Sequence, residues 1–177
     1  AVKLNTQRDV NNEKILHVAP YVKHLSLTVL SENECPTVVD RFPALTELRI
    51  QGISTDHSWV KFMGNITSLS VASVIDLDVV KQIVKNTNLR VLSIRIAKDI
   101  DSVVQQIAQL ADTLEILSLA YKWRPSAPNM NTGFSPCFHK LTELNLRCDS
   151  DWIYWMFQHR FENLRVLNIA NSSYRAF

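Results

Sequence analysis

The histidines and cysteines of this chain are the residues whose types could hold a metal ion or carry a reaction. The five histidines are His17, His24, His57, His139 and His159. None of them belongs to an HExxH motif, and no Gly-x-Ser-x-Gly motif occurs. The three glycines lie too far apart to form a phosphate-binding loop. The motifs therefore predict a protein that is not an enzyme and that uses no cofactor.

Cys137 and His139 are two positions apart, a spacing that occurs in some metal sites. A structural zinc site takes four ligands, and no second pair of matching ligands accompanies these two residues. We therefore expect no metal site at this pair. The three cysteines, which include Cys35 and Cys148, are odd in number and form no CxxC motif. This predicts reduced and buried thiols in an intracellular protein.

Length, charge and hydropathy exclude further classes. The 177 residues, of which 46% are hydrophobic, suit one globular domain. A net charge of +2 is too small for a dedicated nucleic-acid-binding domain. No apolar stretch reaches 18 residues and no signal peptide is recognisable, so we expect no membrane segment and a cytoplasmic or nuclear location. Two glycosylation sequons, at Asn65 and Asn171, leave a secreted or cell-surface recognition module as an alternative.

A repeated apolar pattern requires elements that stack. The pattern apolar-x-x-apolar-x-apolar occurs seven times, and successive copies begin 21 to 27 positions apart. Its last two apolar residues alternate with a polar or small residue, which is typical of a strand with one buried face. Short strands must pair with neighbours, so the pattern predicts about seven parallel strands side by side. The copies begin at Val22, Leu45, Ile66, Leu89, Leu114, Leu141 and Leu164.

The segments between the strands carry apolar residues at helical spacing. The clearest are 78–85 and 101–111, which begin with Asp78 and Asp101 as expected helix N-caps. Weaker helical patterns occupy 11–18, 37–42, 58–63 and 150–161. Because helices are wider than strands, the stack must curve, with the strands on its concave face and the helices on its convex face.

These repeats resemble leucine-rich repeats, and the resemblance covers nearly the whole chain. It implies an α/β solenoid, or horseshoe, formed by residues 1–177 as a single domain of a longer chain. Short secreted repeats carry an asparagine that is missing here. The helical segments and Cys148 are more similar to intracellular repeats of F-box proteins and ribonuclease-inhibitor-like proteins.

The segment 11–28 and the turn at 53–56 resemble the repeats that follow an F-box. The resemblance implies a substrate-recognition region of an F-box-type ubiquitin-ligase subunit. Cullin-RING ligase components would then be partners through an F-box preceding Ala1. The repeat region of another intracellular regulator, or of an immune receptor, is the alternative.

A concave sheet face would bind a protein target. We call each copy of the pattern, with the segment that follows it, a unit, and count positions from its first apolar residue. The third, fifth and seventh positions point out of the concave face. They include Arg49, Arg95 and Arg147, together with an apolar lane of Val91, Ile116 and Val166. Arginine gives directional contacts to acidic or carbonyl groups, and apolar residues beside it are typical of binding surfaces. The alternative is that these positions only solvate an exposed sheet.

The long connection 122–138 is a second candidate for binding. It contains three prolines and no helical pattern, and Trp123 and Arg124 at its start are residue types that dominate interaction hot spots. Trp123 could equally cover the core where a helix is missing.

Overall fold

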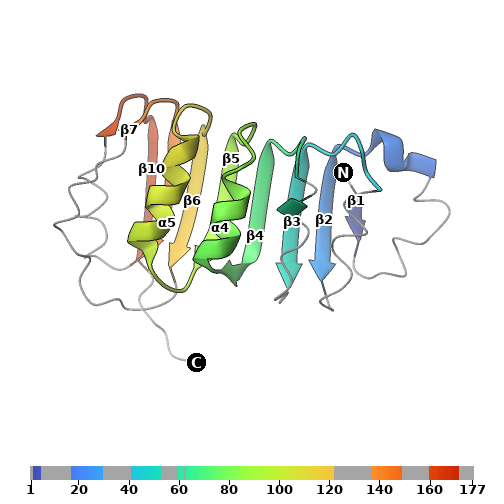
Figure 1. Cartoon of the computed structure of the whole chain (residues 1–177), viewed down its shortest axis with the longest axis horizontal. Coiled ribbons are helices and arrows are strands. Elements are labelled where there is room, and N and C mark those ends of the chain that lie inside the picture. The colour runs from blue at the N-terminus through green and yellow to red at the C-terminus, as the bar shows by residue number, and fades with distance from the viewer. Residues whose placement is uncertain are drawn as a thin grey trace.

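One parallel sheet organises the protein. The computed structural model describes residues 2–4, 17–29, 41–52, 60–61, 63–121, 137–148 and 160–171. In these ranges eight strands lie side by side in the order of the sequence, and every neighbouring pair is parallel (Figure 1). The strands are β1 (Val2–Leu4), β2 (His24–Val29), β3 (Glu47–Gly52), β4 (Ser68–Ile75), β5 (Val91–Ile96), β6 (Ile116–Tyr121), β8 (Glu143–Cys148) and β10 (Val166–Asn171). The α/β class and the parallel sheet predicted from the sequence are confirmed.

The sheet has one strand more than the seven predicted. The additional strand, β1, pairs with β2 and places Val2 opposite Leu25 and Leu4 opposite Leu27. It carries only the last two apolar positions of the repeated pattern, so a search for three apolar residues passes over it.

The same backbone hydrogen bonds recur at each step from β2 to β10. The carbonyl of Lys23 accepts from the amides of Thr46 and Glu47, at 3.0 and 2.9 Å. The equivalent carbonyls that accept two amides of the next unit belong to Thr46, Thr67, Arg90, Glu115 and Thr142. These six equivalent steps align the starts of the strands, because each carbonyl bonds the residues at the equivalent positions of the next unit.

Alternation along each strand separates the core from the opposite face. From β2 to β8, the last two apolar residues of each copy of the repeated pattern are at most 6% exposed. They pack with the buried faces of two helices, α4 (Leu77–Ile83) and α5 (Ile100–Ile107), which lie side by side on one face of the sheet (Figure 1). A 3-10 helix, Ala108–Leu110, continues α5.

The helix N-caps differ from those predicted. Asp76 caps α4 by accepting from the amide of Val79 at 3.0 Å, and Asp99 caps α5 by accepting from Ser102 at 3.4 Å. The predicted caps, Asp78 and Asp101, lie within the first turns. Both helices begin with an Asp-x-Asp sequence, and the helical pattern alone does not decide which aspartate precedes the first turn.

The weaker helical predictions fall mostly outside the described residues. Of 11–18, the described residues 17 and 18 are helical and lead into a 3-10 helix, Ala19–Tyr21. Of 58–63, residues 60 and 61 have 3-10 conformation, and of 37–42, Arg41 lies in a turn. The prediction for 150–161 is wrong at its end, because Arg160–Phe161 forms a strand, β9, that pairs with β7 (Cys137–Phe138). Phe161 stacks on Phe138 with ring centroids 5.7 Å apart, and Phe138 is fully buried.

Candidate functional site

A hollow of about 610 Å³ lies on the sheet face that points away from α4 and α5. We call it the sheet groove. It crosses strands β3 to β10, and small side chains form its floor because the fifth and seventh positions of most units are Ser, Ala or Asn. Its outward-pointing lining residues are Arg49, Ser70, Ala72, Ser93, Arg95, Ser118, Ala120, Asn145, Arg147, Asn168 and Ala170.

The lining of the groove carries positive charge without a carboxylate. Arg49, Arg95 and Arg147 are exposed, and within the described residues none of them forms an ion pair. Two acidic side chains at third positions of the sheet have other partners. Glu47 lies 2.6 Å from His24, and Glu143 accepts from Asn145 at 2.8 Å. Among the residues that the structure describes, the three guanidinium groups thus have no carboxylate partner.

Two of the arginines share one row of the sheet. Arg95 pairs in register with Ala120, which pairs with Arg147. Neighbouring strands are about 4.8 Å apart, so the backbones at these two arginines are separated by about 10 Å. Arg49 lies one row lower, opposite Ser70.

A chain of side-chain hydrogen bonds fixes part of the floor. Asn168 donates from Nδ2 to Oδ1 of Asn145 at 2.7 Å, and Asn145 donates from Nδ2 to Oγ of Ser118 at 3.0 Å. Because the Ser118 hydroxyl accepts a hydrogen bond from Asn145, its own proton can be donated to a ligand. The groove thus offers donors from both its rim and its floor.

The other predicted sheet residues lie outside the groove lining. Val91, Ile116 and Val166 occupy the third-position row at the starts of their strands. Glu143 lies between Ile116 and Val166 in register, so the predicted apolar lane is interrupted by a carboxylate. Val91 and Ile116 are half-buried, and Val166 is 42% exposed.

A bulge in β4 changes the strand register beside the groove. It lies between Ser70 and Val74 and places Val74 opposite Arg95, whereas an uninterrupted repeat would place Ala72 there. Trp123 and Arg124 of the long connection lie outside the described residues.

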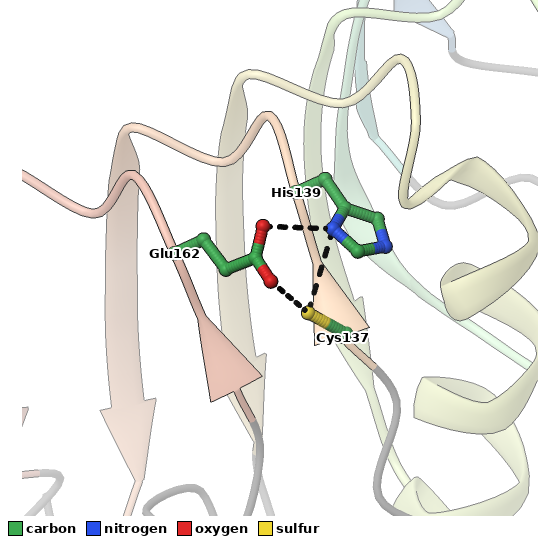
Figure 2. Close-up of side chains that lie close together, drawn as sticks. All are labelled: Cys137, His139 and Glu162. Carbon is green, nitrogen blue, oxygen red and sulfur yellow. Dashed lines mark hydrogen bonds and ion pairs between the residues drawn. The ribbon is translucent and has the colours of Figure 1, made fainter.

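A second cluster of polar side chains lies beside β7 and β9. Cys137 and His139 flank the buried Phe138, and the parallel pairing of Cys137 with Arg160 and of Phe138 with Phe161 brings His139 next to Glu162. Figure 2 shows the three side chains pointing toward one another. Sγ of Cys137 lies 3.6 Å from Nδ1 of His139 and 3.5 Å from Oε1 of Glu162, and Nδ1 lies 3.0 Å from Oε2.

The cluster corrects one prediction made for Cys137 and adds a neighbour to it. The thiol is half-buried and hydrogen-bonded, whereas a fully buried apolar environment was expected. Glu162 joins Cys137 and His139 as a third potential ligand, although no further ligand was recognised in the sequence. The sequence does contain a signal for it: Phe138 and Phe161, and likewise His139 and Glu162, are separated by 23 positions, as are Leu141 and Leu164 of the repeat.

Contacts within the cluster shift the pKa values of Cys137, His139 and Glu162. The hydrogen bond from His139 lowers the pKa of Glu162 and raises that of the imidazole. Burial, followed by the hydrogen bond to Glu162, raises the pKa of the Cys137 thiol. A thiol with a raised pKa is protonated at neutral pH, which is the opposite of what a nucleophilic cysteine requires.

No family model matches this chain, and no match was found among curated proteins or solved structures. In the described ranges, none of the helices has the length and apolar character needed to cross a membrane.

Proposed function

We propose that this chain is a noncatalytic protein-binding domain whose sheet groove receives an acidic segment of a partner protein. The observation that carries the proposal is the set of three arginines without an ion-pair partner in the described residues, arranged around a floor of small side chains. The planar fork of a guanidinium matches a carboxylate through two parallel hydrogen bonds. Serine and asparagine on the floor can bond the peptide groups of the same segment.

In this proposal the domain is a leucine-rich-repeat solenoid. Its support is the sequential order of the parallel strands, the hydrogen bonds that recur at six steps, and the position of α4 and α5 on the face opposite the groove. In such a stack each unit contacts only its neighbours, and the row of strands forms an extended binding surface.

The cellular role that we propose is substrate recognition in an F-box-type ubiquitin ligase of the cytoplasm or nucleus. It rests on the resemblance of 11–28 and 53–56 to repeats of that family. The domain would hold a target while cullin-RING components, recruited by an F-box, supply the ubiquitin chemistry. Co-precipitation of cullin-RING components with the full-length protein tests this role, and their absence would contradict it while leaving the groove's binding function open.

The groove itself is tested by replacing the two arginines, Arg95 and Arg147, that share one row of the sheet. Arg95→Gln combined with Arg147→Gln should weaken binding of a fluorescent peptide rich in Asp and Glu by at least about tenfold, since hydrogen bonds to charged groups contribute about 1.5–3 kcal/mol each. The matched control is Arg165→Gln, because Arg165 is exposed but does not line the groove. Binding that falls equally in both variants would contradict the proposal, as would failure of the unsubstituted protein to bind the peptide.

A further inference from the structure

The cluster beside β7 and β9 brings together three different donor atoms. A thiol sulfur, an imidazole nitrogen and a carboxylate oxygen all lie within 4.8 Å of one another. They come from two segments that are more than 20 positions apart in the sequence and are joined by strand pairing. Neither the sheet groove nor the proposed binding of an acidic segment involves these residues.

We propose that Cys137, His139 and Glu162 form a binding site for a Zn²⁺ ion with its fourth coordination position open to solvent. Zinc binds sulfur at about 2.3 Å and nitrogen or oxygen at about 2.0–2.2 Å, so the ligand atoms of a tetrahedral site are about 3.3–3.6 Å apart. The observed separations are 3.6 Å from Sγ to Nδ1, 3.5 Å from Sγ to Oε1 and 3.0 Å from Nδ1 to Oε2, so the sulfur and the nitrogen each face a different oxygen of the carboxylate. One ligand atom from each residue lies within 4.8 Å of the others, and a rotation of the exposed Glu162 side chain brings a single oxygen toward both the sulfur and the nitrogen.

The hydrogen-bond pattern favours a ligand set over a catalytic relay. In a Cys-His nucleophile, one ring nitrogen faces the thiol and the base is held by a third group elsewhere on the ring. Here the same atom, Nδ1 of His139, faces both the sulfur and the carboxylate, while Nε2 points away from them (Figure 2). The thiol, Nδ1 and the carboxylate thus face one another on one side of the ring, as metal ligands do.

The surroundings of the cluster hold the ligands in place. Cys137 and His139 project to one side because Phe138 between them is fully buried and stacks on Phe161. Asn163 donates from Nδ2 to the backbone carbonyl of His139 at 2.5 Å and so ties the unit of Glu162 to that of the other two ligands. The side chains of His139 and Glu162 are 50% and 53% exposed, which leaves a path for the ion.

The charges of the ligands suit a divalent cation. A Cys137 thiolate and the Glu162 carboxylate together neutralise Zn²⁺, and the thiol proton is released to solvent when the ion binds. The carboxylate of Asp112 is close enough to act electrostatically on both Cys137 and His139. Its negative charge opposes that of the Arg160 guanidinium, which acts on Cys137 and Glu162.

Cobalt titration tests the site, because Co²⁺ replaces zinc and reports thiolate coordination by its absorption. The reduced protein should show a thiolate-to-cobalt charge-transfer band that saturates at one equivalent and disappears when Zn²⁺ is added. Cys137→Ser should abolish the band, and Glu162→Gln should weaken Co²⁺ binding at least about tenfold, the lower limit seen even for groups outside the ligand shell. Circular dichroism should show that both variants keep the fold.

The chain provides a matched control in a second His-Glu pair. His24 and Glu47 are 2.6 Å apart and 51% and 48% exposed, but no cysteine within the described residues joins them. His24→Ala should therefore leave the cobalt band and the affinity unchanged. A band that is missing from the unsubstituted protein would overturn the proposal. A band that persists in Cys137→Ser would assign the metal to another cysteine and overturn it as well.

Discussion

Nδ2 of Asn86 lies 2.7 Å from the backbone carbonyl oxygen of Met63 and donates to it across the boundary between two consecutive units. The same nitrogen donates its second hydrogen to the carbonyl of Ile66 at 2.8 Å, and Oδ1 accepts from the amide of Asn88 at 3.1 Å. One half-buried side chain thus satisfies three backbone groups at the turns that precede β4 and β5.

Replacing this amide should destabilise the protein. Asn86→Ala removes the side-chain partner of the Ile66 carbonyl and of the Asn88 amide, while the Met63 carbonyl keeps its bond from the Ile66 amide. We expect the free energy of unfolding to fall by about 2–3 kcal/mol. The measurement is chemical denaturation followed by circular dichroism. Asn88→Ala is the control, because the exposed Asn88 side chain makes a single bond of 3.2 Å to the carbonyl of Gly64. Equal losses in the two variants would contradict a special role for Asn86.

The fold was predictable from the sequence where periodicity alone decides it. Leu48 and Ile50, with a polar residue between them, could only be the inward side of a strand, and both are buried. The choice between Asp76 and Asp78 as a cap depends on where β4 ends. A bulge lengthens that strand to Ile75, and the apolar pattern does not contain this information.

The candidate sites were predictable only in part. The period of two places Arg49, Arg95 and Arg147 on one face, and a comparison of equivalent positions across units also places Glu143 between Ile116 and Val166, as the register shows. The Cys137 cluster depends on the same comparison, because Glu162 reaches His139 only through the pairing of two short strands. A search for ligands at short spacings along the sequence cannot find a residue that strand pairing brings close.

The burial of a leucine in the sheet should determine how much its replacement by alanine lowers the free energy of unfolding. Leu92 is fully buried in β5, so Leu92→Ala should lower the free energy of unfolding by about 2–5 kcal/mol. Leu167 holds the equivalent position in β10 but is 41% exposed, so Leu167→Ala should cost about half as much or less. Urea denaturation of both variants measures the difference. A larger loss for Leu167→Ala than for Leu92→Ala would contradict the prediction.

Asp101 should make stability depend on pH. Its Oδ1 is buried without a hydrogen-bond partner in the described residues, and burial, followed by the charge of Asp99, raises the pKa of this carboxyl above 3.8. The folded protein then binds the proton more readily than the unfolded chain, so stability falls as the pH rises through this raised pKa. Asp101→Asn should have a higher melting temperature at pH 7, and the gain should shrink as the pH falls toward 3.8.

Asp78→Asn is the matched control for this substitution. Asp78 occupies the same place in the first turn of α4, but it is exposed and pairs with Lys81 at 2.8 Å. Its replacement should give no gain in melting temperature at pH 7, because an exposed carboxylate near a helix N-terminus is favourable. Equal behaviour of the two variants between pH 4 and pH 7 would contradict the effect assigned to the burial of Asp101.

The spacing of Arg95 and Arg147 should select among acidic peptides. Their backbones are about 10 Å apart across two strand steps. A polyproline II segment rises about 3.1 Å per residue with three residues per turn, so glutamates at positions i and i+3 lie on one side about 9 Å apart. A peptide with repeated Glu-Pro-Pro units should therefore bind more tightly than one of the same composition with its glutamates adjacent. The difference should be about fivefold, which corresponds to one exposed ion pair of about 1 kcal/mol.

Fluorescence anisotropy measures both affinities, and Arg147→Gln should abolish the preference because a single arginine of the row cannot distinguish the two spacings. Equal affinities in the unsubstituted protein would mean that the groove attracts negative charge without reading its spacing.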